Sequence, residues 1–386
     1  MTSKAPLRVL HLDTERGWRG GQNQVLQLLQ GLRAKGLQQT LLCEEGEDLD
    51  RRTKGLCQHI TWQGGSLVSQ LRSFIRLRTW LKHNPPDIVH AHTSKAHGIA
   101  LVALISLGKA ATASRFIIHR RVDYLPSSNG FSRWKYLHAR NDVYICVSEF
   151  VRKMLEDFGV PAQKLLTIRS AVPAPLKTFT KQESLSLRES YSKKLSLHGQ
   201  SKIILCVAAF TEQKGHQYLI QALIQLKASH PKPFVVLFAG EGELLEDCKI
   251  FATKADLSDH VRFLGHRDDI DELIEVCDVG VLSSVDEGLG SILLNFAWHA
   301  RPVCASSVGG IPEIIQNEFT GLLVPSRDPA ALADCLKRML ENPEQARVWG
   351  ENFYRWAQEH ASMDANIEAI YRSYLASFAL TREATL

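Results

Sequence analysis

The chain has 386 residues, 45% hydrophobic and 23% charged, a composition typical of soluble globular proteins, and its length favours two domains over one. Its net charge of +5 is unevenly divided: residues 1–200 hold 30 Lys/Arg and 15 Asp/Glu, and residues 201–386 hold the remaining 16 and 26. The basic half carries no zinc-finger or RNP module, so we expect no nucleic-acid partner. An anionic membrane surface or a phosphorylated substrate suits this charge better.

The sequence carries no signal for a membrane span or for secretion. Its longest apolar run, IALVALISL at 99–107, is too short to cross a bilayer, and MTSKAPLRVLHL lacks a signal-peptide pattern. The eight cysteines form no C-x-x-C pair, and several lie within apolar runs such as IILCV. We therefore expect a cytoplasmic protein whose cysteines are buried free thiols.

Short apolar runs alternate with amphipathic segments along the first half of the chain. The predicted strands are 7–12, 39–44, 87–92, 115–123, 142–148 and 165–172. The predicted helices are 23–36, 66–84 and 149–159. Strands that alternate with helices indicate βαβ units and a largely parallel sheet.

After a polar stretch at 174–200, which reads as a linker carrying a helix, the alternation begins again. The predicted strands of this second set are 202–210, 233–242, 260–266, 278–284 and 301–307. We expect an α/β protein with two Rossmann-like, doubly wound parallel-sheet domains. The expected division is 1–173, the linker 174–200, 201–350, and C-terminal helices at 351–386 that pack towards the N-terminal domain.

The loop with the most chemical character is DEGLGSILLNFAWHARPV at 286–303, where a Gly-x-Gly step follows an acidic pair and precedes an apolar helix. The glycines lack Cβ atoms where backbone N–H groups would be unpaired, which is suited to binding phosphate. A plain βα turn is equally consistent with this pattern. Glu287 is better suited to sugar hydroxyls than to phosphate.

Several segments together resemble the GT-B glycosyltransferases of family 4, the retaining nucleotide-sugar transferases. DEGLGSILLNFAWHARPVCASSVGGIPEII is similar to the family's glycine- and glutamate-containing signature. GGQNQVLQLLQGL, PDIVHAHTSKAHGIA and VSEFVRKMLEDFGVPAQKLLTI are similar to segments of its N-terminal half. The resemblance spans nearly the whole chain and implies a GT-B fold, in which the two domains face a central cleft.

The resemblance assigns a donor site to the second half. Lys214 matches the lysine that grips the donor diphosphate, and Glu287 matches an acid that contacts the transferred sugar. A cation is needed there because charge grows on the diphosphate leaving group in the transition state. The implied donor-binding residues in this half are Lys214, Gly215, Glu287, Gly288, Leu289, Gly290 and Asn295. Gly309 and Gly310 are expected to be structural.

In the first half the resemblance implies a catalytic role for His119, although a histidine at a strand end is usually polar surface. Gly20 and Gly21 match the family's glycine-rich loop, which closes over the donor. Arg120, Arg121 and Asp123 are acceptor-side candidates, with plain surface as an equal alternative. No metal ligand and no cofactor are implied.

Two positions depart from the family pattern. Ala209 stands where the family has an arginine, which removes one diphosphate-binding cation. Asn295 stands where the family has a glutamate for the ribose hydroxyls, although an amide can still donate and accept hydrogen bonds. These departures leave open a changed donor or a weakened enzyme.

We therefore expect a metal-independent, retaining glycosyltransferase that acts in lipopolysaccharide or other cell-envelope glycan synthesis. Its partners would be a nucleotide-sugar donor and an anionic glycolipid or oligosaccharide acceptor. The alternatives are a non-catalytic GT-B nucleotide-sugar-binding or scaffold subunit, and a GT-B epimerase or phosphorylase.

The helix at 69–82 raises the question of a membrane surface. Its apolar residues at 67, 71, 74, 75 and 81 favour packing on the sheet, while its four basic residues keep interfacial binding open. Peripheral binding to the cytoplasmic face of the inner membrane is the corresponding alternative for localisation.

Overall fold

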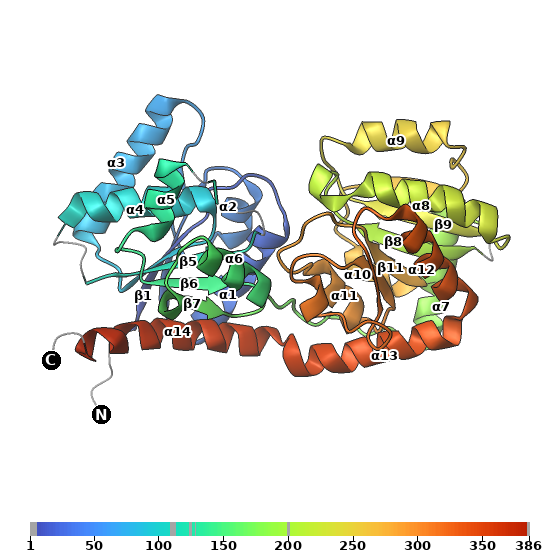
Figure 1. Cartoon of the computed structure of the whole chain (residues 1–386). Helices are drawn as coiled ribbons and strands as arrows, with labels where there is room; N and C mark the ends of the chain where they lie inside the picture. The colour runs from blue at the N-terminus through green and yellow to red at the C-terminus, as the bar shows by residue number, and fades with distance from the viewer. Residues whose placement is uncertain (1–5, 109–112, 123–125, 128, 199–200, 384–386) are drawn as a thin grey trace. The chain divides into compact units, whose positions relative to one another are not determined.

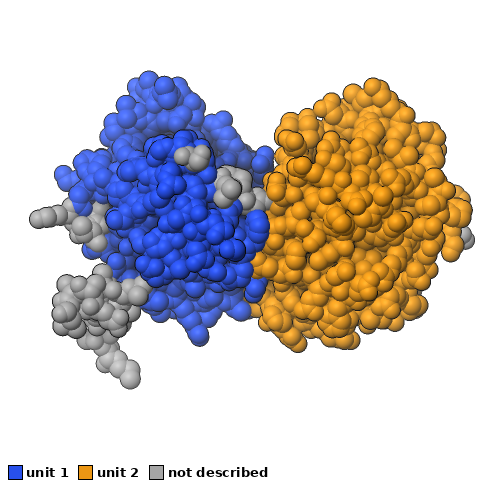
Figure 2. Space-filling model, in the orientation of Figure 1, with its two compact units in different colours: residues 1–171, 363–386 blue, residues 172–362 orange. Residues whose placement is uncertain are grey.

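The computed structural model describes residues 6–108, 113–122, 126–127, 129–198 and 201–383. The chain divides into two compact units, one formed by residues 1–171 and 363–386 and the other by residues 172–362 (Figure 2). Each unit contains one parallel sheet with helices packed beside it (Figure 1). The α/β doubly wound fold expected from the alternation of segments is confirmed.

Unit 1 is built on a seven-stranded sheet of order β3-β2-β1-β4-β5-β6-β7. Its strands are β1 (Arg8–Leu12), β2 (Gln38–Glu44), β3 (Gln58–Trp62), β4 (Ile88–Ala91), β5 (Arg115–Arg120), β6 (Val143–Cys146) and β7 (Leu165–Thr167). Each pair of neighbouring strands in this sheet runs parallel. The central strands are buried on both faces, which explains their nearly continuous apolar runs.

The helices of unit 1 cover both sides of this sheet. They are α1 (Gly20–Ala34), α2 (Asp48–Thr53), α3 (Leu67–His83), α4 (Ser94–Leu107), α5 (Gly130–Leu137), α6 (Glu149–Asp157), the 3-10 turn η2 (Ala162–Lys164) and α14 (Met363–Glu383). Helices α4 and α6 are N-capped by Thr93 and Ser148, whose side chains accept hydrogen bonds from the backbone of the first turn.

Unit 2 is built on a six-stranded sheet of order β10-β9-β8-β11-β12-β13. Its strands are β8 (Lys202–Val207), β9 (Phe234–Ala239), β10 (Val261–Gly265), β11 (Val279–Leu282), β12 (Val303–Ser306) and β13 (Leu322–Val324). Its helices are α7 (Lys181–Lys194), η3 (Glu212–Lys214), α8 (His216–Ser229), α9 (Leu245–Lys254), α10 (Ile270–Val276), α11 (Ile292–Trp298), η4 (Ile311–Glu313), α12 (Pro329–Glu341) and α13 (Pro343–His360).

The unit boundaries differ from the domain limits expected from sequence. Helix α7 lies in the segment read as a linker, yet Arg188 ties it to unit 2 through bonds to the Val276 carbonyl and the Asp278 carboxylate. Of the C-terminal segment 351–386, the part up to Ser362 belongs to unit 2, where α13 packs on α11. Helix α14 packs in unit 1, where Ile367, Ile370 and Tyr374 join the core.

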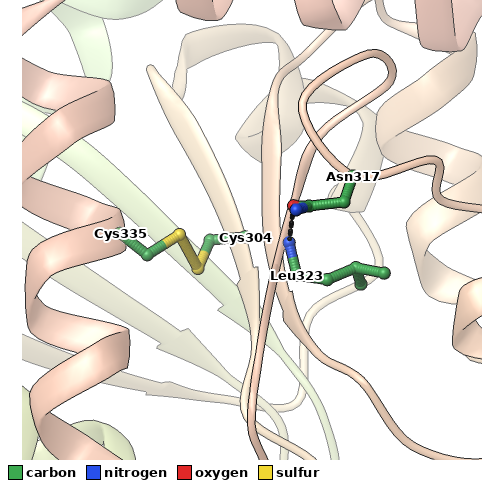
Figure 3. Close-up of a disulfide and its surroundings, with 4 residues drawn as sticks. All are labelled: Cys304, Asn317, Leu323 and Cys335. Atoms are coloured by element: carbon green, nitrogen blue, oxygen red, sulfur yellow. Dashed lines mark hydrogen bonds between the residues drawn. A yellow bond between two sulfur atoms is a disulfide. The ribbon is translucent and has the colours of Figure 1, made fainter.

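The expectation that all eight cysteines are free thiols is wrong for one pair. Cys304 in β12 and Cys335 in α12 form a disulfide (Figure 3). The other six cysteines are free thiols. Their Cα atoms lie 6.6 Å apart, within the range that a disulfide spans. The packing of α12 on β12 brings them together, and a separation of 31 residues in sequence gave no sign of it.

The expectation that the apolar side of α3 packs on the sheet is also wrong for part of the helix. Leu77 and Leu81 are buried, but Leu67, Leu71 and Ile75 are 84%, 59% and 54% exposed. The exposed residues follow one another at four-residue intervals and therefore form one stripe. Within the described residues, no helix is long and apolar enough to cross a bilayer.

Candidate functional site

The two loops of unit 2 that contain Lys214 and Glu287 follow β8 and β11, which are neighbours in the sheet. The carboxyl ends of parallel strands meet at one edge, so these loops lie together. Lys214 ends η3 in the first loop, and its Nζ lies 2.5 Å from Oε2 of Glu287 in the second. The Ser284 hydroxyl donates to the same oxygen over 3.1 Å. The structure thus brings together the cation and the carboxylate singled out from sequence.

Two glycines allow this close approach of the loops. Gly215 has φ +61°, and a Cβ there would lie 2.3 Å from the Ser283 carbonyl oxygen. Gly309 has φ +54°, and a Cβ there would lie 1.7 Å from the Glu287 carbonyl oxygen. Any side chain at either position would therefore displace the backbone beside the Lys214–Glu287 pair.

Most of the other residues of unit 2 that the resemblance assigns to the donor follow Glu287. Gly288, Leu289 and Gly290 are buried, and the Gly310 N–H bonds to the Glu287 carbonyl over 3.1 Å. Helix α11 starts only at Ile292 and has seven residues, so it is shorter than the segment read as a helix. Asn295 is partly buried on α11, and Ala209 is partly buried in the loop after β8.

Unit 1 carries a cluster of four buried histidines at the carboxyl edge of its sheet. The strand register pairs His11 with His90, while His92 follows the end of β4 and His119 lies near the end of β5, at the same edge. The rings of His90 and His119 are 5.5 Å apart and nearly parallel, and those of His90 and His92 are 4.1 Å apart. His119 therefore does not lie on a polar surface, because it is only 5% exposed.

Arg121 fixes the proton positions within this cluster. Its Nη1 lies 3.0 Å from His92 Nδ1, and a guanidinium can only donate, so His92 Nδ1 must accept. His92 is then protonated at Nε2, which lies 3.0 Å from Nδ1 of His11 and donates to it. Arg121 also donates from Nε to Gln24 over 3.1 Å.

Burial keeps these histidines neutral. Desolvation lowers the pKa of His11 to about 3 and the pKa values of His90, His92 and His119 well below the usual value, with Arg121 adding to the effect. Nδ1 of His90 lies 2.7 Å from the Tyr374 hydroxyl of α14. At neutral pH His119 can thus donate or accept a hydrogen bond, but it is not a cation.

The other candidates in unit 1 have separate surroundings. Arg120 is 2% exposed and donates from Nη1 to the Tyr136 hydroxyl over 2.7 Å. Asp123 lies outside the described residues. Gly20 and Gly21 begin α1, and a Cβ at Gly21 would meet nothing within 4 Å, so packing does not demand glycine there.

Two groups of side chains in the described residues have metal-ligand spacing. In the first, His11, His90 and His92, the Arg121 guanidinium commits the His92 ring to hydrogen bonds on both nitrogens. In the second, Cys43, Asp50 and His59, the His59 ring bonds to Asp50 over 2.9 Å and to Thr53 over 3.2 Å. Each arrangement therefore commits at least one histidine ring, His92 or His59, to hydrogen bonds on both of its nitrogens.

Sequence reasoning missed His11, His90, His92 and Tyr374. The pair in VHAHT was readable, because alternate residues of a strand face the same side. His11 could be assigned to the cluster only once β1 was known to lie beside β4. Tyr374 could be assigned only once α14 was known to pack in unit 1, because it is 284 residues away from His90 in sequence.

Two family models cover most of the chain. Residues 18–174 match the model described as Glycosyltransferase Family 4, and residues 188–356 match the one described as Glycosyl transferases group 1. A putative glycosyltransferase, EpsD of Bacillus subtilis, is 30% identical over 275 residues, covering 69% of this chain and 70% of EpsD. The Escherichia coli UDP-Gal:alpha-D-GlcNAc-diphosphoundecaprenol alpha-1,3-galactosyltransferase is 24% identical and covers 83% of this chain and 87% of its own length.

Solved structures show the same fold. Anabaena HepE in complex with UDP-glucose superposes with a TM-score of 0.83 at 17% identity, covering 96% of this chain and all of that one. WaaG, a glycosyltransferase involved in lipopolysaccharide biosynthesis, has a TM-score of 0.71 at 16% identity and covers 94% and 99%. The chain belongs to the GT-B glycosyltransferases of family 4.

Proposed function

We propose that this glycosyltransferase moves a sugar, with retention of anomeric configuration and without a metal ion, from a nucleotide diphosphate sugar to an acceptor hydroxyl. The observation that carries the proposal is the Lys214–Glu287 pair at the edge where the β8 and β11 loops meet. Gly215 and Gly309 clear the backbone beside the pair. The complex of HepE with UDP-glucose, in the same fold, supports a donor of this class.

Each member of the pair has a role in transfer. Lys214 would leave Glu287 for the donor diphosphate and offset the charge that grows on the leaving group, the task that a metal performs in other transferases. Glu287, released from Lys214, would accept hydrogen bonds from the sugar. Gly20, Gly21, Gly288, Leu289, Gly290 and Asn295 would complete the donor site.

His119 would contact the reacting sugar as a neutral ring. In the front-face attack described for the family, the departing phosphate takes the acceptor proton, so no strong base is needed. A buried histidine with a lowered pKa suits a hydrogen-bonding role better than that of a cation.

The proposed acceptor is an anionic glycolipid or oligosaccharide of the cell envelope. The excess of Lys and Arg in residues 1–200 favours an anionic partner. The diphosphoundecaprenol named for the E. coli relative and the lipopolysaccharide role named for WaaG support the same class.

The exposed stripe of α3 supports peripheral binding to an anionic inner-membrane surface from the cytoplasm. Leu67, Leu71 and Ile75 form the apolar part, and the exposed Arg72 and Lys82 lie on the same helix. Burying such a stripe in the headgroup region, with basic residues beside anionic lipids, is favourable. The Leu71→Ser/Ile75→Ser variant should sediment less with phosphatidylglycerol vesicles than the wild type, and unchanged sedimentation would contradict the membrane role.

The donor proposal is tested by a screen of nucleotide sugars, with donor hydrolysis and transfer measured for the wild type, Lys214→Ala and Glu287→Ala. We expect one donor to bind, both variants to lose turnover, and NMR of the product to show the anomeric configuration of the donor. If no donor binds, or if both variants turn over normally, the proposal fails. An inverted product would contradict retention alone.

Ala209 and Asn295 favour a second candidate, a non-catalytic GT-B subunit that binds a nucleotide sugar. This candidate predicts donor binding without transfer. The variant Ala209→Arg/Asn295→Glu distinguishes an active transferase from a non-catalytic subunit. If the wild type is inactive and this variant transfers sugar, the two departures account for the loss of activity.

A further inference from the structure

Three side chains with metal-binding atoms meet at the outer edge of the unit 1 sheet, where α2 connects β2 to β3. Cys43 comes from β2, Asp50 from α2 and His59 from β3. Oδ1 of Asp50 lies 2.9 Å from Nδ1 of His59 and 4.0 Å from Sγ of Cys43. The sulfur, the oxygen and the nitrogen all lie within 4.8 Å of one another, so they are close enough to bind one ion.

The surroundings of His59 place a proton on its Nε2. This nitrogen lies 3.2 Å from the Thr53 carbonyl oxygen, which can only accept a hydrogen bond, so Nε2 donates. The Thr53 hydroxyl, also 3.2 Å from Nε2, gives its own proton to the Leu49 carbonyl over 2.6 Å.

The other ring nitrogen of His59 faces a carboxylate. When the ring is neutral, Nδ1 carries a lone pair and lies 2.9 Å from Oδ1 of Asp50, which also carries lone pairs. Two acceptors at this distance repel each other. The contact is therefore favourable only with a cation between them, which is either a second proton on His59 or a metal ion.

The position of Cys43 favours the metal ion over the proton. A proton shared by His59 and Asp50 satisfies both of these side chains and gives the thiol no role. A metal ion would use all three, and a thiolate, an imidazole and a carboxylate together suit Zn²⁺. Cys43 is buried, and burial raises the pKa of its thiol, so a bound cation is needed to deprotonate it.

The far side of each polar ligand is already held in place. Oδ2 of Asp50 accepts from the Gly46 backbone N–H over 3.1 Å, and the exposed Lys54 approaches the same oxygen, so Oδ1 is left for an ion. His59 is held through Nε2 by the Thr53 carbonyl. Histidine ligands of metal ions commonly donate their second N–H to a backbone carbonyl in this way, which orients the ring.

The segment that carries these ligands also contacts the loop leading into α1. Glu47, the N-cap residue of α2, accepts from the Gly17 backbone N–H over 3.0 Å. The Arg52 guanidinium of α2 lies 4.3 Å from the centre of the Trp18 ring. This loop ends at Gly20, the first residue of α1. An ion that fixes α2 on β2 and β3 would therefore also steady this loop.

We propose that Cys43, Asp50 and His59 form a zinc site in unit 1, which the family resemblance does not imply. On binding, the thiol and any second proton of His59 pass to solvent, and zinc takes Sγ, Oδ1 and Nδ1 with a water molecule as its fourth ligand. The ion is structural and takes no part in sugar transfer. Only its effect on the loop before α1 bears on the proposed donor site.

Zinc alone is the probe, added to full-length protein from which metal has been removed with a chelator. Calorimetry should show one zinc ion bound per chain, and zinc should raise the Tm. Cys43→Ser should weaken zinc binding at least about tenfold, since even outer-shell changes cost that much. Cys206→Ser, at a buried free thiol of β8 in unit 2, is the matched control and should bind zinc as the wild type does.

Cobalt(II) distinguishes this site from the histidine cluster, which contains no cysteine. The cobalt-loaded wild type and Cys206→Ser should show a thiolate-to-cobalt charge-transfer band in the near ultraviolet, and Cys43→Ser should lack it. Asp50→Asn, which keeps the side-chain shape, is the second variant and should weaken zinc at least about tenfold. Circular dichroism checks that each variant is folded.

The site is overturned if the wild type binds no zinc, if the cobalt–thiolate band persists in Cys43→Ser, or if folded Asp50→Asn binds zinc as tightly as the wild type. UDP binding to the wild type is measured separately. Failure to bind UDP would contradict the proposed donor while leaving the zinc result intact.

Discussion

The two units each present a lysine at the carboxyl edge of a parallel sheet, and the two lysines are in opposite electrostatic situations. Lys214 in unit 2 is partly exposed and already paired with Glu287. Lys135 in unit 1 is more deeply buried, and its ammonium bonds to the two oxygens of Ser94 and lies 4.8 Å from the centre of the Tyr136 ring. A lysine paired with a carboxylate is stabilised by an opposite charge, whereas a buried lysine bonded to neutral oxygens pays more of the cost of desolvation.

The largest effect is expected from removing the paired lysine. Lys214→Met should lower kcat for sugar transfer by about 10²- to 10³-fold, because a preorganised charge that stabilises the leaving group is lost. Steady-state assays with the identified donor measure this loss. Lys249→Met, at a partly exposed lysine on α9, is the matched control. A similar fall in kcat for that variant would show that the loss is not specific to Lys214.

The pH dependence of the free energy of unfolding should reveal the lowered pKa of Lys135. Its pKa is about 8 in the folded chain and 10.5 in the unfolded one, so between these values the unfolded chain holds a proton that the folded chain has released. Stability therefore rises from pH 8 to 10.5 by up to about 3 kcal/mol from this group. The contribution of Lys135 is obtained from urea unfolding at a series of pH values, as the difference in the free energy of unfolding between the wild type and Lys135→Met.

His97, which faces Lys135, does not interfere in this window, because its pKa is lowered to about 3 by burial and by Lys135. A difference curve that is flat between pH 8 and 10.5 would show that the pKa of Lys135 is not lowered in the folded chain.

The same two lysines should shift stability in opposite directions at pH 7. Lys135→Met removes a buried charge and should raise the free energy of unfolding by about 1 kcal/mol. Lys214→Met leaves the largely buried Glu287 carboxylate without its cation and should lower it by about 1 kcal/mol. Denaturant titrations of both variants measure the two changes in the free energy of unfolding. Changes of the same sign would show that the two lysines do not differ in electrostatic environment.

The smallest effect is expected from freeing Lys214. Glu287→Gln leaves the cation without its carboxylate, so UDP alone should bind a few times more tightly even as sugar transfer falls. Calorimetry with UDP tests this, and Glu313→Gln, at the end of the 3-10 helix η4 of unit 2, serves as the control. Weaker UDP binding in Glu287→Gln would mean that Glu287 does not compete with the diphosphate.

The fold was largely predictable from sequence because strands buried on both faces leave continuous apolar runs. The runs at 202–210 and 233–242 correspond to β8 and β9. Short elements were missed: β13 has three residues, and β3 carries the polar residues Gln58, His59 and Thr61 beside two buried ones. The apolar periodicity of α3 led us to expect more of its residues in the core than are found there. An exposed apolar stripe and a packed one have the same spacing in sequence.

The donor-side residues could be placed from sequence because Lys214 and Glu287 lie in recognisable loops after adjacent strands. Lys135 could not be placed. In FSRWKYLHAR it resembles a surface lysine, and its burial depends on Ser94, 41 residues earlier in the chain. The histidine cluster likewise depends on which strands are neighbours in the sheet, and the Cys304–Cys335 disulfide depends on how α12 packs.

The return of the chain to unit 1 sets the order in which the protein can be completed on the ribosome. Unit 2 is one continuous segment, but unit 1 lacks α14 until the whole of unit 2 has been synthesised. Until then Ile367 is missing from its place against Gly31, and the Tyr374 hydroxyl is missing from His90. The N-terminal unit therefore acquires its finished core last, and its half-built apolar surface is exposed to chaperones for most of the time of synthesis.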